Sequence, residues 1–353
     1  MKVCIITFPL EGAGVIPLKH LVDILCEISS KVSLISGDAG YEAFSKDKRV
    51  RAHNVEHVSS TSLLMRVMNY VLTQLKISYR LLRVDANVCL FFIGGEGLLL
   101  PMMIARSLRK KVVLALAGNP AKGSKVKGDP LTKATAFLSR VGFFLANRII
   151  VYSMRIAAER GLHGKKTSVA HEHFVDFNKF RVTKPINVRD NVVGYIGRLS
   201  EEKGFLNFLE AIPLVPDDVK FLIAGSGVLH SRIPEGTKYL GWIPHERLPK
   251  YLNRLKLLVL PSYTEGLPNV ILEAMACGTP VLTTSVGAIP DIIRDSETGF
   301  ILADNSSECI VEGIDRVMNC PNLGEVVKNA RKLVEREFDF EAAVEGYRRA
   351  LEQ

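Results

Sequence analysis

Short runs of apolar and β-branched residues alternate along the chain with longer segments whose apolar residues recur every three or four positions. This alternation is typical of βαβ units that build a parallel sheet. In the first half, the runs predict strands at 2–7, 31–35, 87–93, 111–116, 148–152 and 167–170. In the second half, they predict strands at 191–196, 219–224, 238–241, 256–260 and 280–283, with a short edge strand at 299–302.

The two sets of strands predict two α/β domains in tandem, each a doubly wound, Rossmann-like sheet. A length of 353 residues agrees with this, because it exceeds what one hydrophobic core usually fills. The polar segment 181–191, which contains Pro185, is the predicted linker. We therefore expect an N-terminal domain at 1–182, a C-terminal domain at 183–340 and a last helix, 341–353, that packs back on the first domain.

The composition, 47% hydrophobic and 24% charged residues, is that of a chain that buries substantial cores, so disorder is not expected. The first apolar run ends at Pro9 and Glu11, which is too short for a secretory signal. No stretch of about eighteen apolar residues lacks a charge, so we expect no membrane-spanning helix. The six cysteines are scattered and form no CxxC pair, which predicts neither disulfides nor zinc. These features favour a cytoplasmic protein.

The net charge of +9 is distributed unevenly. Residues 1–180 carry 26 basic and 13 acidic side chains, whereas residues 181–353 carry 20 basic and 24 acidic ones. This asymmetry predicts that only the first half meets an anionic surface. A solvated basic face without a partner is the alternative.

Ligands of parallel α/β sheets bind beyond the carboxyl ends of the strands, so the loops that follow strands carry the informative residues. The first such loop contains Gly12 and Gly14, which allow the backbone to approach a phosphate or a sugar closely. A plain tight turn explains this pair equally well, because the third glycine of the dinucleotide fingerprint is missing.

The loops of the second half carry a denser pattern. Arg198 and Lys203 follow a predicted strand in the sequence GRLSEEKG, where they could clamp two phosphates; a solvated charged turn is the alternative. Further glycine-rich strand ends follow in IAGSG (223–227) and YLGWIP (239–244). Close approach of the backbone to a ligand is therefore predicted at three neighbouring loops.

A fourth segment, TEGLPNVILEAMACGTP (264–280), brackets a helix of about ten residues, because Pro268 suits the first turn and Gly278 the carboxyl cap. The N–H groups at the start of this helix would favour a diphosphate. Glu265 precedes the helix and Glu273 lies about one and a half turns inside it. One carboxylate can then reach the sugar end of a ligand while the other reaches its ribose.

These four motifs, in this order over about residues 190–300, resemble the retaining GT-B-fold glycosyltransferases of family 4. The resemblance implies GT-B architecture, with two Rossmann-like domains facing a central cleft. It implies transfer of a sugar from a UDP-, GDP- or similar nucleotide sugar to an acceptor hydroxyl, with retention and without a metal or other cofactor. The implied setting is cell-surface glycan, glycolipid or lipid-linked saccharide synthesis, with a saccharide or lipid-linked acceptor. The absence of an Asp-x-Asp metal motif agrees with this.

The resemblance also implies roles for single residues. Arg198 and Lys203 would bind the donor diphosphate, Glu265 would contact the donor sugar near its anomeric carbon, and Glu273 would hold the ribose hydroxyls. The remaining donor-binding positions are Gly14 in the first domain and, in the second, Gly197, Gly225, Ile243 at the base, Gly266, Leu267, Asn269 and Val270.

Two departures from the family pattern stand in the first half. Ala117 occupies the place of a histidine that contacts the donor sugar in many relatives, and Asn119 is a candidate hydrogen-bond partner in its stead. The usual Asn-Gly-Val-Asp turn reads HFVD at 173–176. His171 and His173 have no third ligand nearby in sequence, so we expect a structural role for them and no metal site.

Polar residues between Leu63 and Arg83 fall three or four positions apart and make one largely basic stripe, in which Arg66, Lys76 and Arg80 are the acceptor- or membrane-side candidates together with Asn119. Nearly everything else in the segment is apolar. Such a helix can lie in an anionic membrane interface, on the inner face of the membrane, or pack against its own sheet. The pattern leaves both options open.

Two other functions remain as alternatives. A sugar-nucleotide 2-epimerase shares the same architecture, and a non-catalytic module could bind a membrane or another anionic surface through the basic half. No nucleic-acid partner is expected, because basic motifs interleaved with aromatic residues are missing.

Overall fold

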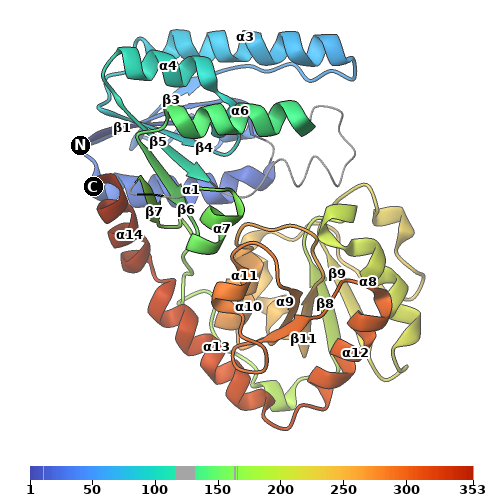
Figure 1. Ribbon diagram of the computed structural model, residues 1–353. Helices are drawn as coiled ribbons and strands as arrows, with labels where there is room; N and C mark the ends of the chain where they lie inside the picture. The colour runs from blue at the N-terminus through green and yellow to red at the C-terminus, as the bar shows by residue number, and fades with distance from the viewer. Residues whose placement is uncertain (11, 117–131, 163, 165, 353) are drawn as a thin grey trace. The chain divides into compact units, whose positions relative to one another are not determined.

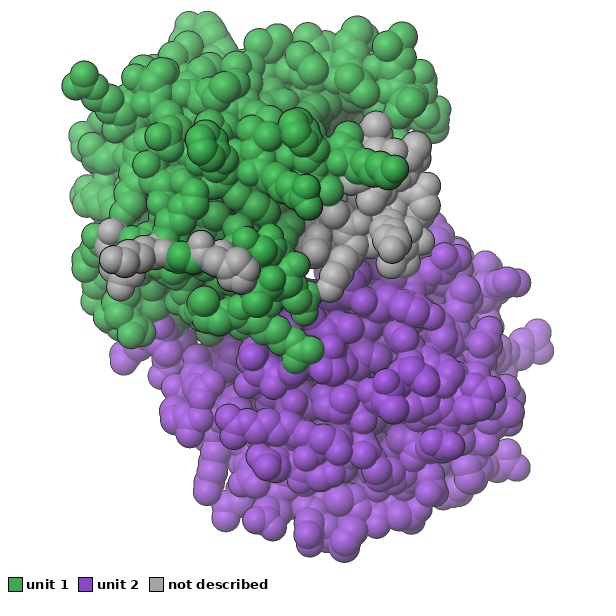
Figure 2. Space-filling model, viewed as in Figure 1, with its two compact units in different colours: residues 1–173, 343–353 green, residues 174–342 purple. Residues whose placement is uncertain are grey.

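The computed structural model describes all residues except 11, 117–131, 163, 165 and 353. The chain divides into two compact units, which Figure 2 shows in separate colours. Unit 1 comprises residues 1–173 and 343–353, and unit 2 comprises residues 174–342. Both are α/β units with an all-parallel sheet, as the sequence predicted. Within the described ranges, no helix is both long and apolar enough to cross a bilayer.

Unit 1 contains a seven-stranded parallel sheet in the order β3-β2-β1-β4-β5-β6-β7. Figure 1 shows α3, α4 and α6 on one face of this sheet and α1 on the other. Fully buried side chains such as Ile6, Phe91 and Leu114 fill the space between the sheet and the helices. The strands are β1 (Lys2–Thr7), β2 (Lys31–Ser36), β3 (Val50–Asn54), β4 (Val88–Phe92), β5 (Lys111–Leu116), β6 (Arg148–Val151) and β7 (Thr167–Val169). The helices are α1 (Val15–Ile28), α2 (Asp38–Glu42), α3 (Leu63–Leu81), α4 (Leu99–Ser107), α6 (Thr132–Leu145), α7 (Met154–Glu159) and α14 (Phe340–Glu352), the last of which begins in unit 2.

Strand β3 was not predicted from the sequence. It pairs with β2 at the edge of the sheet, with Val50 opposite Val32, and only its first residue is buried. Its sequence, VRAHN, lacks an apolar run because an edge strand with little cover needs none. Every other strand was predicted to within one residue at either end, except that 238–241 is shortened to Lys238–Tyr239.

Helix α14 returns to unit 1 and closes it at β7. The Lys111 ammonium donates to the Leu351 carbonyl at 2.7 Å. At the centre of this contact, the fully buried carboxyl of Glu172 lies 2.5 Å from the Tyr152 hydroxyl and 3.5 Å from that of Tyr347. Burial raises the pKa of Glu172 to about 7 and outweighs the hydrogen bonds that lower it.

Helix α3 buries polar side chains and exposes apolar ones, which is the reverse of an ordinary surface helix. The predicted polar stripe is split, because Asn69 and Thr73 are buried against unit 1 while Lys76 and Arg80 are exposed. Gln74 and Ser78 are also buried. The exposed face consists mainly of apolar residues: Leu63, Leu64, Met65, Val67, Met68, Val71, Leu72, Leu75 and Tyr79. The prediction that these polar residues form one continuous stripe was therefore wrong.

Unit 2 contains a six-stranded parallel sheet in the order β10-β9-β8-β11-β12-β13. Helices α8 and α12 cover one face, and α9, α10 and α13 cover the other (Figure 1). The strands are β8 (Val192–Ile196), β9 (Lys220–Ala224), β10 (Lys238–Tyr239), β11 (Leu257–Leu260), β12 (Val281–Thr284) and β13 (Phe300–Leu302). The helices are α8 (Phe205–Ala211), α9 (Leu248–Leu252), α10 (Asn269–Ala276), α11 (Ile289–Ile292), α12 (Ser307–Met318) and α13 (Leu323–Glu337).

The segment 181–191 is an ordered part of unit 2 and not the linker that its polarity suggested. Its Arg189 side chain is only 4% exposed. The guanidinium donates to the carbonyls of Lys184, Leu252, Leu255 and Cys277 and to the Thr279 hydroxyl at 2.7–3.3 Å. A charged residue in the sequence thus serves as an internal cross-link, and burial lowers its pKa to about 10.

Candidate functional site

The sheet of unit 2 has its topological switch point between β8 and β11, where the strand order reverses. The loops that leave the carboxyl ends of these two strands carry the sequences GRLSEEKG and TEGLPN. In a doubly wound sheet, this is the position at which ligands bind. The fold therefore brings two motifs, more than sixty residues apart in sequence, together at the carboxyl ends of β8 and β11.

Lys203 and Glu265 join these two loops directly. The Lys203 ammonium lies 2.6 Å from Glu265 Oε2, and the other oxygen of this carboxylate accepts a hydrogen bond from Ser262 Oγ at 2.8 Å. The Glu265 side chain is 9% exposed and that of Lys203 is 22% exposed. Both oxygens of Glu265 are thus held in place. A fixed orientation of this kind is what a side chain needs if it is to act on one particular atom of a ligand.

Arg198 is paired within its own loop. Its guanidinium donates to Glu202 Oε1 at 2.7 Å. The Arg198 side chain is 48% exposed, whereas that of Glu202 is nearly buried. The Tyr195 hydroxyl donates to the Arg198 carbonyl at 2.8 Å and fixes the start of the loop. Arg198 therefore has an anchored backbone and a guanidinium that is accessible to an anion.

Two glycines let neighbouring loops approach each other closely at these strand ends. Gly204 has φ +64°, and a Cβ there would lie 2.0 Å from the Pro261 carbonyl oxygen. Gly225 has φ +134°, and a Cβ there would lie 1.8 Å from the Gly197 oxygen. No side chain fits in either place, so these glycines are required by the backbone whether or not a ligand binds.

Glu273 lies on α10 and is 6% exposed. Its Oε1 is 2.6 Å from His245 Nε2, and because a carboxylate only accepts, that nitrogen carries the hydrogen. The His245 ring also contacts Phe180 at a centroid distance of 5.1 Å. His245 was missed in the sequence, although it directly follows Ile243 and Pro244 in the third motif.

The other predicted donor-binding residues lie around these pairs. Helix α10 begins at Asn269, one residue after Pro268, so that Asn269 and Val270 form its half-buried first turn. Leu267 is buried, and the Gly266 carbonyl accepts from the Ala288 N–H at 2.9 Å. Ile243 is half-buried and sits beside the exposed Trp242. Gly14 lies in unit 1, in the 3-10 turn Gly12–Gly14 after β1. The contacts of all these residues with a donor stay predictions.

Two predicted features fall elsewhere. Asn119 and Ala117 lie outside the described residues. His171 Nδ1 lies 3.1 Å from the His173 carbonyl oxygen, and the His173 ring stacks edge-on against Tyr152 at 4.8 Å. Among the residues that the structure describes, no three His, Cys, Asp or Glu side chains are grouped so that they could hold a metal.

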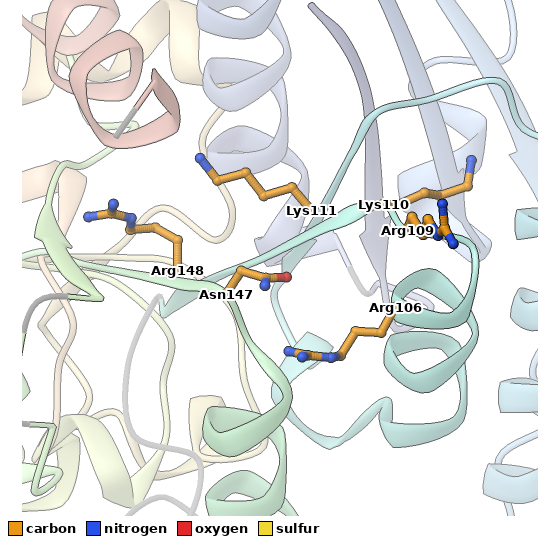
Figure 3. A pocket seen from close by; sticks show the side chains of 6 residues that line it. All are labelled: Arg106, Arg109, Lys110, Lys111, Asn147 and Arg148. Carbon is orange, nitrogen blue, oxygen red and sulfur yellow. The ribbon is translucent and has the colours of Figure 1, made fainter.

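Figure 3 shows a separate cavity of about 450 Å³ in unit 1, lined by basic side chains. It lies where β5 and β6 begin, at the amino ends of the strands of unit 1, whereas ligands of parallel α/β sheets bind beyond the carboxyl ends. Three of its cations donate to backbone carbonyls: Arg106 to Leu145, Lys110 to Val84 and Lys111 to Leu351. The cavity is lined by Arg106, Arg109, Lys110, Lys111, Asn147 and Arg148 and contains none of the candidate site residues.

Comparison with known proteins finds a family match over the region that carries these motifs. Residues 176–334 match the family model "Glycosyl transferases group 1". This region is therefore similar to group 1 glycosyltransferase domains. CapM of Staphylococcus aureus, a capsular polysaccharide biosynthesis glycosyltransferase, is 31% identical over 189 residues, which are 50% of each chain. The match spans half or less of the length of each of the first curated relatives.

A longer match extends over both units. A Campylobacter jejuni alpha-1,4-N-acetyl-D-galactosaminyltransferase is 24% identical over 346 residues, which are 94% of this chain and 93% of that protein; its name gives a saccharide linked to PP-undecaprenol as its acceptor. Among solved structures, HepE of Anabaena in complex with UDP has a TM-score of 0.77 at 18% identity and covers all of both chains. Sucrose-phosphate synthase of Thermosynechococcus elongatus has a TM-score of 0.79 at 17% identity and covers 100% of this chain and 99% of the other. The fold of the chain is therefore GT-B, as predicted.

Proposed function

We propose that this chain transfers a sugar from a nucleoside-diphosphate sugar to an acceptor hydroxyl and retains the configuration of the anomeric carbon. The observation that carries the proposal is the 2.6 Å contact between Lys203 and Glu265 at the switch point of unit 2. This contact joins the motif that the resemblance assigns to the donor diphosphate, through Lys203, to the motif that it assigns to the donor sugar, through Glu265. The group 1 domain match over residues 176–334 supports the same reaction class.

In this reaction, the bond between the anomeric carbon and the diphosphate oxygen breaks while a bond to the acceptor oxygen forms on the same face. The acceptor proton moves to the leaving phosphate. Arg198 and Lys203 stabilise the negative charge that develops on the diphosphate, which is the largest single contribution available to such a site. Because cationic side chains supply this stabilisation, we propose that no metal ion is required.

Glu265 and Glu273 divide the recognition of the donor. Glu265, fixed by Lys203 and Ser262, contacts the sugar near its anomeric carbon. Glu273, oriented by His245, holds the ribose hydroxyls. Glycines 197 and 225 and the first turn of α10 then border the diphosphate, where helical N–H groups favour an anion.

For the acceptor, we propose a saccharide or lipid-linked saccharide of a cell-surface glycan, on the cytoplasmic side of the membrane. The names of two relatives support this choice, one in capsular polysaccharide synthesis and one with a PP-undecaprenol-linked acceptor. The nucleotide base and the sugar are left to experiment.

A panel of UDP- and GDP-sugars tested by thermal shift identifies the donor, because a ligand that binds only the native state raises the melting temperature. Release of the nucleoside diphosphate is then measured with and without a polyprenyl-diphosphate-linked saccharide, in the presence of EDTA. We expect the nucleoside diphosphate to be released only when the acceptor is present. We also expect the new glycosidic bond, examined by NMR, to have the same anomeric configuration as the donor. Formation of the 2-epimeric sugar nucleotide without an acceptor product would establish the epimerase instead. Binding of a donor without transfer to any acceptor would indicate a non-catalytic binding module.

A further inference from the structure

The outward face of α3 is apolar along its whole length. Leu64 is 77% exposed, and Val67, Val71 and Leu75 are each about half exposed. Burial of one such side chain is favourable by about 1.5 kcal/mol or more, so a row of them in contact with water is costly. Contiguous apolar surface of this kind marks a place where something else binds.

The orientation of α3 is fixed by hydrogen bonds from its opposite face. The Asn69 amide donates to the Val58 carbonyl at 2.6 Å, and Gln74 Oε1 accepts from the Leu100 N–H at 3.1 Å. Thr73 Oγ1 lies 2.9 Å from His57 Nδ1. Rotation of the helix to bury its leucines would leave these buried polar groups unsatisfied, which costs about 1–3 kcal/mol for each. The hydrogen bonds to unit 1 therefore keep the apolar face of α3 directed outward.

The charged side chains that α3 itself carries are all of one sign, although Lys76 also donates to the backbone carbonyl of the exposed Glu56 at 3.1 Å. Lys76, Arg80 and Arg83, which lie four and three residues apart, follow one edge of the apolar face. Helix α3 contains no Asp or Glu, and neither do α4 and α6, which lie with it on the same side of the sheet (Figure 1). The occupant of this face must therefore combine an apolar interior with negative charge at its surface.

We propose that the exposed face of α3 is a docking surface for an anionic lipid bilayer. The apolar side chains enter the interface between headgroups and acyl chains, while Lys76, Arg80 and Arg83 meet the lipid phosphates. Because the other face of α3 is bonded to unit 1, the helix lies along the membrane surface. A second copy of this chain fits less well, since a twofold contact between two α3 helices would bring the same cations together, and α3 carries no acidic residue to pair with them.

Vesicle co-sedimentation tests this surface without any donor or acceptor, so its result is independent of the proposed glycosyl transfer. The full chain is expected to bind vesicles of phosphatidylglycerol and phosphatidylcholine and to stay in solution with phosphatidylcholine alone. In about 1 M salt, where the Debye length is about 3 Å, binding is expected to weaken strongly.

Two double variants separate the two contributions. Lys76→Gln with Arg80→Gln is expected to lower the partition coefficient about 30-fold, because each basic residue near an anionic surface contributes about fivefold. Val71→Ser with Leu75→Ser is expected to lower it about 100-fold. The matched control, Val188→Ser with Leu214→Ser, removes apolar side chains of similar exposure from unit 2 and is expected to bind as the wild type does.

Equal binding to neutral and anionic vesicles, or no binding to either, would overturn the proposal. So would a wild-type chain that forms dimers in solution which Val71→Ser with Leu75→Ser dissociates, since the face would then be covered by a second copy. The comparison of wild type across lipids and salt holds even if a variant folds poorly, and circular dichroism checks each variant.

Discussion

Replacement of Glu172 by Gln is expected to change the pH dependence of the stability of unit 1. The Glu172 carboxyl is fully buried between Tyr152 and Tyr347, and its neighbours in the chain, His171 and His173, are the other titratable groups that face it. Gln keeps the shape of the side chain and an oxygen that accepts from Tyr152, but it cannot ionise. The variant therefore isolates the effect of the carboxylate charge.

The magnitude follows from the shift of the pKa of Glu172 from its ordinary value of 4.5 to about 7. A raised acid pKa means that the folded state holds the proton more tightly. The stabilisation is thus fully present below about pH 4.5 and is lost as the pH rises through 7. A shift of this size corresponds to on the order of 3 kcal/mol. The Gln variant has no carboxyl to ionise and does not lose this stabilisation. The free energy of unfolding of the variant minus that of the wild type should therefore rise by about 3 kcal/mol between pH 4.5 and pH 8.

Urea unfolding followed by circular dichroism at pH 4.5, 6, 7 and 8 measures this difference, and it should appear in the transition that exposes Cys89, a buried thiol of unit 1. Labelling of Cys277 reports unit 2 in the same samples. Glu345→Gln, on the exposed side of α14, is the control and should parallel the wild type at every pH. A constant difference between wild type and Glu172→Gln over this range would refute the reasoning, because the carboxyl would then not titrate there.

Three further predictions concern unit 2. Arg189→Met should destabilise it by about 3 kcal/mol or more, because several buried acceptors lose their donor, and the urea concentration at which Cys277 becomes labelled should fall. Arg198→Ala or Lys203→Ala should lower kcat by roughly two to three orders of magnitude, because the contact strengthens as the leaving group gains charge. Glu273→Ala should mainly raise KM for the donor, since ribose contacts are equal in ground and transition states, whereas Glu265→Ala should mainly lower kcat.

Each of these predictions has a matched control on the exposed surface of the same unit. Arg254→Met should leave unit 2 as stable as the wild type, Lys220→Ala should keep full turnover, and Glu297→Ala should change neither kcat nor KM. A fully active Arg198→Ala or Lys203→Ala protein would contradict the diphosphate assignment. An equal rise in KM without any loss of kcat for both glutamate variants would contradict the division of roles.

The strands and the candidate site of unit 2 could be predicted because their signals are local. A central parallel strand such as β8 or β11 is buried on both faces and appears in the sequence as an apolar run. The residues of the candidate site follow these strands directly, so strand prediction also located the loops. Strand β3 escaped because the edge of a sheet places no such demand on its sequence.

Arg189 and His245 escaped for a different reason. Their roles depend on partners that are distant in sequence: Arg189 bonds to groups near residues 252–255 and 277–279, and His245 meets Glu273. The polar segment around Arg189 was predicted to be the linker, because polarity cannot tell an exposed arginine from one that satisfies buried carbonyls. Only the packing of α9 and α10 around it decides that.

The pairing of Lys203 with Glu265 refines the roles that the motifs imply. Arg198 is half exposed and its partner Glu202 lies in the same loop, so its guanidinium can turn toward an anion without disturbing another motif. Lys203 is more buried, and its ammonium holds the carboxylate that is assigned to the sugar. Loss of Lys203 would therefore remove a diphosphate contact and also release Glu265, which Ser262 alone would then position. Lys203→Ala should for this reason lower kcat more than Arg198→Ala does, because two groups that act on the same transition state are lost together.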